Sequence, residues 1–143
     1  MRYYCLLILC FGAIFTSIAQ DILGQWKSID DVTGIEKSIV EIYKKDGKIY
    51  GKVIEIFNES KRDLLCSFCK GEDYNKPVLG LVIIKNMEEV KKGFYKNGTI
   101  TNPDDGKIYT CRLKLDEVNP NRLQVRGYIS FFYRTQYWER VID

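Results

Sequence analysis

From residue 24 to residue 141, the chain is a series of short segments in which apolar and polar residues alternate. An alternation with a period of two places successive side chains on opposite faces of a β-strand, one face toward a core and the other toward water. Turn-forming residues separate the segments at the spacing that is typical of a sandwich or a barrel. The pattern predicts strands at residues 24–30, 36–45, 48–57, 81–86, 94–102, 106–117, 121–130 and 133–141.

The clearest hairpin joins the second and third predicted strands through the Asp-Gly pair at residues 46–47. Both residues accept the positive φ that a type I′ turn requires. A two-residue loop at this point pairs Tyr43 with Tyr50 and Glu41 with Lys52. The register therefore sets an aromatic ring against an aromatic ring and an acid against a base, which favours it independently of the turn.

Two stretches depart from the alternation. Asn86 can cap a helix that starts at Met87, and Gly93 can end it, with acids first and bases last as the helix dipole prefers. We therefore expect one or two helical turns at residues 87–92. Residues 58–80 show no periodic pattern, so we expect them to form a long loop.

The motif Gly24-Gln25-Trp26 opens the first predicted strand. In lipocalin-like barrels, a Gly-x-Trp at this place lays its indole across the closed end, and an arginine of the last strand covers the indole. Closing the meander also removes its exposed edges. We predict an all-β fold, a single antiparallel up-and-down eight-stranded lipocalin-like barrel, in which Trp26 and Arg140 close one end. The alternative is an ordinary core tryptophan.

The second and third strands can turn either face toward the interior. One choice points Val40, Ile42 and Val53 inward, and the other buries the Glu41–Lys52 pair. Because a buried ion pair is costly unless its hydrogen bonds are complete, we predict the first.

The N-terminus has the layout of a secretory signal peptide. Arg2 is followed by an apolar stretch at residues 5–15 and by the small-x-small site Ser17-Ile18-Ala19. The stretch is shorter than the roughly 20 residues that span a bilayer. We predict that residues 1–19 are removed, that residues 20–143 form the mature domain, and that the product is secreted or periplasmic with no stable membrane anchor.

Charge and composition exclude several classes of function. The chain has 22 Lys and Arg against 19 Asp and Glu, without a dense basic cluster, so we expect no nucleic-acid partner. It has no histidine, which excludes Ser-His-Asp and Cys-His catalysis and histidine-based metal sites. The acid pairs 30–31 and 104–105 sit in predicted turns, where aspartate usually bonds nearby backbone. We therefore predict no enzyme, no catalytic residues, no metal and no cofactor.

The cysteines after residue 19 form the pattern Cys66-x-x-Cys69, with Cys111 farther along. Structural zinc needs about four ligands, and a thioredoxin-like site needs a βαβ context, which is absent here. Bridges 66–69, 66–111 and 69–111 are conceivable. We predict the Cys66–Cys69 disulfide, because two intervening residues hold these cysteines close, and we expect Cys111 to face the core.

Aromatic residues gather where the last two predicted strands meet, at Tyr128, Phe131, Phe132 and Tyr133. They either line the barrel mouth or contact a partner, or they are buried at the rim.

Eight segments together carry a family resemblance. They are GQWK (24–27), IDDVTG (29–34), SIVEI (38–42), DGKIYGK (46–52), CSFCKG (66–71), NPDDGKIY (102–109), LQVRGY (123–128) and RTQYWER (134–140). In these segments the chain resembles the bacterial family called domain of unknown function 2147. Residues 131–133 depart from it, being bulkier than its Gly-containing approach to Arg-Thr-Gln. The resemblance implies a secreted lipocalin-like barrel and no activity.

We interpret the chain as a non-enzymatic envelope protein that binds a small, mostly apolar molecule inside its barrel. The expected lining and mouth residues are Val40, Ile42, Val53, Tyr128, Phe131, Phe132 and Tyr133. The alternative is a protein-interaction or structural module with a filled barrel. A cavity of about 300 Å³ or more favours the first interpretation.

Overall fold

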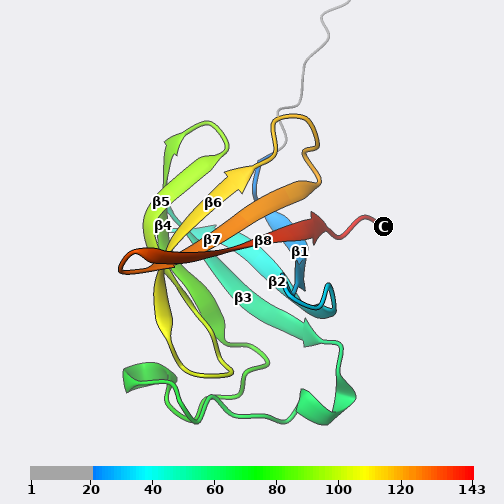
Figure 1. Ribbon diagram of the computed structural model, residues 1–143, viewed down its shortest axis with the longest axis vertical. Coiled ribbons are helices and arrows are strands. Elements are labelled where there is room, and N and C mark those ends of the chain that lie inside the picture. The colour runs from blue at the N-terminus through cyan, green and yellow to red at the C-terminus, as the bar shows by residue number, and fades with distance from the viewer. Residues whose placement is uncertain (1–20) are drawn as a thin grey trace, which may run out of the picture.

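Antiparallel strands that follow one another in the chain also lie side by side in space, and the first pairs with the last. The computed structural model describes residues 21–143, and these form one closed barrel (Figure 1). The predicted all-β, up-and-down barrel is confirmed. The strands are β1 (Gly24–Ile29), β2 (Glu36–Lys45), β3 (Lys48–Ile56), β4 (Val82–Lys91), β5 (Phe94–Thr101), β6 (Ile108–Leu115), β7 (Arg122–Ile129) and β8 (Phe132–Arg140). The predicted signal peptide, residues 1–19, lies outside the described residues.

The β2–β3 hairpin has the predicted register. Tyr43 lies opposite Tyr50 with the ring centroids 5.8 Å apart, and Glu41 lies opposite Lys52. The turn at residues 46–47 has positive φ at both positions, 51° and 79°, as a type I′ turn requires. Local turn chemistry and cross-strand pairing therefore agree on this hairpin.

The helical turn predicted at residues 87–92 is wrong, because β4 continues through this stretch. Met87 is fully buried, and Glu88 pairs with Lys96 of β5. A helix of six residues is marginal by itself, whereas the strand buries Met87 in the core and pairs its backbone on both sides. Asn86, expected as a helix cap, has a φ of 59° within the strand, and Gly93, with a φ of 74°, belongs to the β4–β5 turn.

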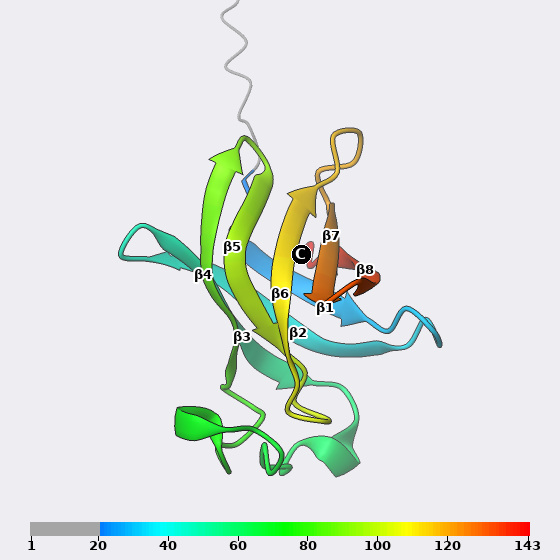
Figure 2. The same ribbon diagram turned by 60° about the vertical axis from the view of Figure 1, so that its left-hand side comes forward.

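The connection between β3 and β4 is the longest in the barrel. It contains two short 3₁₀ turns, η1 (Glu59–Lys61) and η2 (Gly71–Asp73), and it runs below one end of the barrel, beside the end of β3 (Figure 2). Cys66 and Cys69 are buried within it.

The interior follows the alternation of the strands. Val40, Ile42 and Val53 are buried, while Glu41 and Lys52 stay on the outer face. This is the face that the cost of burying an ion pair favours. The largest fully buried side chains are Trp26, Trp138, Ile22, Ile42, Ile84, Met87, Leu113 and Leu123.

One end of the barrel is closed by Trp26 and Arg140, which lie opposite each other in the β1–β8 register. The indole is fully buried, its Nε1 donates to the carbonyl oxygen of Ile22 at 2.9 Å, and the guanidinium lies 4.3 Å from the ring centroid. Burial lowers the pKa of Arg140 from its usual value. The guanidinium nevertheless donates to three backbone carbonyl oxygens, those of Asp21 (2.7 Å), Leu23 (3.0 Å) and Pro120 (3.3 Å).

Gly24 allows this close approach. Its φ is 123°, which L-residues with side chains rarely adopt, and a Cβ there would lie 3.4 Å from Nη1 of Arg140. The glycine of the Gly-x-Trp motif therefore positions the backbone over which the arginine lies.

Replacing either residue of this contact should destabilise the barrel. We expect Trp26→Ala to lower the free energy of unfolding by about 3–5 kcal/mol through loss of a large core side chain. Arg140→Ala should cost about 2–3 kcal/mol, because it removes the stacking and the bonds to three carbonyl oxygens. Denaturant unfolding of both single variants and the double variant measures these costs. A coupling of about 1 kcal/mol or more is expected, and strict additivity would contradict the contact.

Candidate functional site

The end of the barrel away from Trp26 is hollow. It contains a cavity of about 620 Å³, lined by the halves of the strands that lie beyond the closed end and by the β3–β4 connection. The wall residues on or beside the strands are Ser28, Glu36, Lys37, Ser38, Val53, Ile56, Ile83, Ile100, Thr101, Tyr109, Val125, Gly127, Arg134 and Gln136. The cavity therefore occupies the place where lipocalin-like barrels have room for a small molecule.

Most of the deep wall is aliphatic. Val53, Ile83 and Val125 are buried and face the cavity. Gly127 keeps space open inside β7, because a Cβ at this position would lie 3.0 Å from Cβ of Tyr109. The absent side chain lets the Tyr109 ring lie within the barrel.

The inner face of β8 places polar groups beside this apolar wall. Arg134 donates through two nitrogens to the carboxylate of Asp31, and Gln136 donates to the same carboxylate at 3.4 Å. The Gln136 side-chain oxygen in turn accepts from the indole Nε1 of Trp138 at 2.9 Å. These contacts fix the orientation of the Gln136 amide at the cavity wall.

The two members of the Asp31–Arg134 pair stabilise each other's charged form. The hydrogen bond from Arg134 holds the pKa of Asp31 below its usual value, and Asp31 raises the pKa of Arg134. The pair links β8 to the β1–β2 turn.

The expectation that the aspartates of the acid pairs 30–31 and 104–105 bond nearby backbone is right for Asp30 and Asp105. Asp105 accepts a hydrogen bond from the backbone amide of Lys107 at 2.9 Å. Asp30 accepts hydrogen bonds from the backbone amides of Val32 and Thr33. Asp31, in contrast, reaches across to Arg134. The sequence holds one hint of this contact. Arg134 lies on the same face of the last strand as Gln136, Trp138 and Arg140, because these residues alternate along it.

Two serines on the neighbouring strands β1 and β2 form a small polar spot in the wall. The hydroxyl oxygens of Ser28 and Ser38 are 2.7 Å apart, across the β1–β2 pair. Neither serine carried a sequence signal, because a serine in a strand is ordinary by composition. Together with Thr101, Tyr109 and Gln136 they place hydrogen-bonding groups around the wall. Charged side chains also line the cavity, namely Asp30, Glu36, Lys37, Lys61, Asp104 and Arg134.

The rim of the cavity is held by the disulfide loop. Cys66 and Cys69 form the predicted pair, with their Cα atoms 5.3 Å apart, which supports the proposed bridge. The loop packs on the turn at residues 102–106, where any side chain at Gly106 would collide with the carbonyl of Phe68. Gly106 also has a φ of 71°. Both the close approach to Phe68 and the positive φ therefore require glycine at this position.

An ion pair connects the same turn to the start of β2. Nζ of Lys37 lies 2.9 Å from the carboxylate of Asp104, and both residues line the cavity. The rim is thus built from the disulfide loop, the 102–106 turn and the beginning of β2.

The residues expected to line the cavity lie in three different parts of the barrel: the cavity wall, the closed end and the β7–β8 hairpin. Val53 is in the cavity wall. Val40 and Ile42 are buried but lie outside the wall, because they pair with Trp26 and Gly24 at the closed end, where the indole fills the barrel. The aromatic residues Tyr128, Phe131, Phe132 and Tyr133 also lie outside the wall, on the β7–β8 hairpin.

Cys111 faces the core as expected and is fully buried. Burial raises the pKa of its thiol to about 12. The thiol is therefore protonated and sheltered at neutral pH.

Two further features bear on the chemistry of the site. Across residues 21–143, no group of three or more His, Cys, Asp or Glu side chains is arranged to hold a metal ion. Within the same part of the chain, no helix has the length and apolar character needed to cross a membrane.

Comparison with known proteins agrees with this architecture. Residues 24–140 match the model of a family described as an uncharacterized protein conserved in bacteria, DUF2147. The fold is similar to the solved structure of protein HP1028 from the human pathogen Helicobacter pylori, described as belonging to the lipocalin family. The two are 24% identical, the match covers 86% of this chain and 84% of that chain, and the TM-score is 0.73. None of the curated proteins matches this sequence.

The thiol chemistry gives a direct check on the rim. In the processed protein, peptide mapping without reductant should recover Cys66 and Cys69 in one bridged peptide. Iodoacetamide at about pH 8 should leave Cys111 unmodified until the protein is unfolded, because the buried thiol is protonated. Finding Cys111 in a bridge, or both loop thiols free, would contradict this arrangement.

Proposed function

The chain belongs to the bacterial DUF2147 family, and we propose that it is an exported, non-enzymatic protein that binds a small, mostly apolar molecule in its barrel. The observation that carries this proposal is the cavity of about 620 Å³ beneath the rim. This volume lies within the range of small-molecule sites, which hold few polar groups in a mostly apolar wall.

The wall favours an apolar body with a limited number of polar atoms. Val53, Ile83 and Val125 offer buried aliphatic surface, and transferring apolar ligand surface from water to it is favourable by roughly 25 cal/mol per Å². Gln136 and Tyr109 stand at the wall as hydrogen-bonding groups that would orient the ligand.

The charged residues at the cavity support binding over catalysis. Hydrogen bonds hold the pKa of Asp30 and of Asp31 below their usual values, so neither carboxylate is suited to exchange protons near neutral pH. The other two carboxylates at the cavity are in ion pairs, Asp104 with Lys37 and Glu36 with Lys27. None of these groups is prepared as a general base.

A module with a filled barrel is the alternative function. It would need side chains in the volume that the cavity occupies, and Gly127 instead leaves room inside β7. The cavity therefore favours ligand binding over this alternative.

The cysteine pair supports export. A disulfide between Cys66 and Cys69 persists in an oxidising compartment, which agrees with the predicted signal peptide at residues 1–19. We accordingly propose a secreted or periplasmic location.

Filling the cavity should abolish binding without disturbing the closed end. We expect Val125→Phe, which adds a ring to the cavity wall, to weaken binding of the amphipathic dye anilinonaphthalene sulfonate about tenfold or more. Fluorescence titration of the dye measures the affinity, and thermal unfolding checks that the variant is folded. If Val125→Phe does not fold, Ile100→Phe fills the same cavity from a half-buried position.

The control makes the same substitution far from the cavity. Val118 lies in the β6–β7 turn and is 94% exposed, so Val118→Phe should leave the dye affinity unchanged. Equal affinity of wild type and Val125→Phe would contradict the proposal. So would native mass spectrometry of protein from its own host that gave only the apo mass, together with a wild-type protein that binds no dye.

A further inference from the structure

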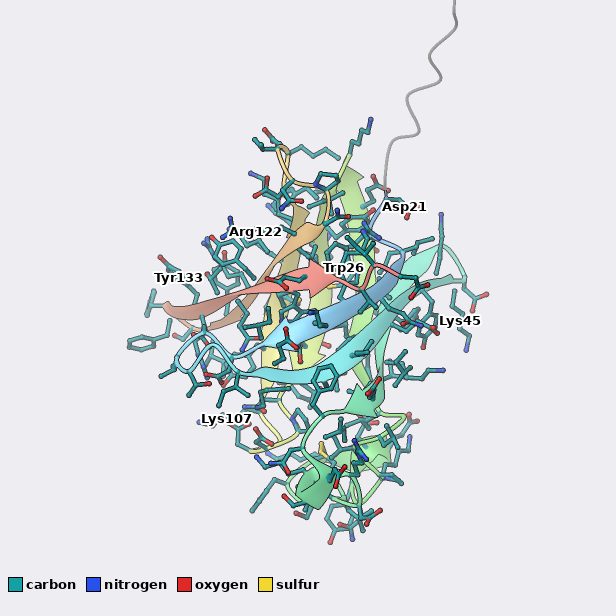
Figure 3. All side chains as sticks on the ribbon, turned by 90° about the vertical axis from the view of Figure 1, so that its right-hand side faces the viewer. Asp21, Trp26, Lys45, Lys107, Arg122 and Tyr133 are labelled. Carbon is teal, nitrogen blue, oxygen red and sulfur yellow. A yellow bond between two sulfur atoms is a disulfide. The ribbon has the colours of Figure 1, made fainter. Side chains whose placement is uncertain are left out.

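The β7–β8 hairpin ends in an exposed aromatic cluster. We define the aromatic tip as Ile129, Phe131, Phe132 and Tyr133. Phe131 is 96% exposed and Phe132 is 78% exposed. Figure 3 shows Tyr133 near the turn of this hairpin, projecting to the side of the molecule and far from Trp26. Large apolar side chains on a projecting turn are unfavourable in water and mark a contact surface.

The pairing of the strands explains why the tip projects. β8 pairs with β1 only through Trp26↔Arg140 and Lys27↔Glu139, at its C-terminal end. Toward the tip, Tyr128↔Tyr133 and Ile129↔Phe132 pair within the hairpin. Tyr128 still pairs with Thr110 of β6, so the hairpin is two-stranded only beyond this pair. There it projects past the β1–β8 seam, and none of the described residues covers it.

Two arginines stand directly behind the tip. The guanidinium of Arg112 lies 4.7 Å from the ring centroid of Tyr128, and that of Arg126 lies 4.7 Å from the ring centroid of Tyr133. Among residues 21–143, neither arginine takes part in an ion pair. From its end, the hairpin thus presents phenylalanine rings and then tyrosine rings. Behind them stand two positive charges without an ion-pair partner, Arg126 of β7 and Arg112 of the neighbouring β6.

We propose that the aromatic tip docks the protein reversibly on the surface of a lipid bilayer that contains anionic phospholipid. A membrane interface accepts these side chains in the same order. Phenylalanine inserts at the acyl boundary, tyrosine lies at the headgroups, and arginine lies at the phosphates. The charges of Arg112 and Arg126 are complementary to anionic headgroups.

The geometry favours a membrane over a protein partner. A stable protein–protein interface buries about 800 Å² on each partner and needs a matching surface. A narrow ribbon end offers much less area than this, whereas a fluid bilayer adapts to whatever shape is inserted. The neighbouring β1–β2 turn adds a second apolar contact, because Val32 is 82% exposed and Asp31 joins this turn to Arg134 of β8.

The docking site goes beyond the proposed function and has a consequence for it. Arg134 and Gln136 follow the tip along β8 and line the cavity. A docked tip would therefore hold the cavity wall beside the bilayer, where a mostly apolar molecule is dissolved. Docking is tested without any cavity ligand, so failure of one proposal is distinguishable from failure of the other.

Vesicle co-sedimentation tests the docking directly. The protein is purified in its naturally processed form and mixed with vesicles of phosphatidylglycerol and phosphatidylethanolamine, or with vesicles of phosphatidylcholine alone. We expect the protein to bind the anionic vesicles more tightly than the neutral ones. Binding to the anionic vesicles should weaken as salt is added. The Phe131→Ser/Phe132→Ser double variant should have a vesicle partition coefficient at least about tenfold lower than wild type, because it loses two inserted rings.

The control variant is Val118→Ser, which removes an equally exposed apolar side chain from the β6–β7 turn. Its partitioning should equal that of wild type. All of these side chains are exposed, so the variants should keep the wild-type melting temperature.

A tryptophan placed at the tip reports insertion independently. Phe131→Trp should show a blue shift of its emission on addition of anionic vesicles and quenching by brominated lipid, while Val118→Trp should show neither. Wild-type protein that does not sediment with vesicles would overturn the proposal, as would a double variant that binds like wild type. Tip-dependent self-association in the ultracentrifuge without vesicle binding would overturn it in favour of a protein contact.

Discussion

The stacking of Arg140 on Trp26 is the contact on which the rest of the architecture depends. β1 and β8 share only two residue pairs, so backbone hydrogen bonds at this seam are few. The guanidinium adds bonds to carbonyl oxygens before β1 and in the β6–β7 turn, which ties three segments together at one end. Closing the barrel here removes its exposed edges and gathers the large buried side chains at the same end, which leaves the other end hollow.

The hollow end is held together differently. β1 and β8 no longer pair there, and the Asp31–Arg134 ion pair spans the gap between the β1–β2 turn and β8. The disulfide loop and the 102–106 turn complete the rim, where Gly106 permits their close approach. The β1–β8 seam is thus joined by backbone pairing and side chains at the closed end and by a side-chain ion pair alone at the hollow end. The free β7–β8 hairpin is a product of the same splayed seam.

The sequence predicts the barrel well because its evidence is local and periodic. Alternation locates the strands, the Asp-Gly turn sets one register, and the parity of Val40 and Val53 follows from the cost of burying the Glu41–Lys52 pair. Parity gives the face of a strand but not the depth along the barrel axis, so Val40 and Ile42 were expected in the cavity wall and lie in the closed core. The helix at residues 87–92 failed because burial of Met87 outweighs a favourable order of charges. The partner of Asp31 depends on a contact across more than a hundred residues, which no local pattern encodes.

The account's central claim is that closure at Trp26 leaves a functional cavity at the opposite end. The most direct test is a crystal structure of protein purified from its own host without added ligand. The account predicts a hollow bounded by Val53, Val125 and Gln136, with continuous density for a bound small molecule inside it. A barrel packed solid at this end, with the wall side chains or residues of the β3–β4 connection filling the volume, would contradict it.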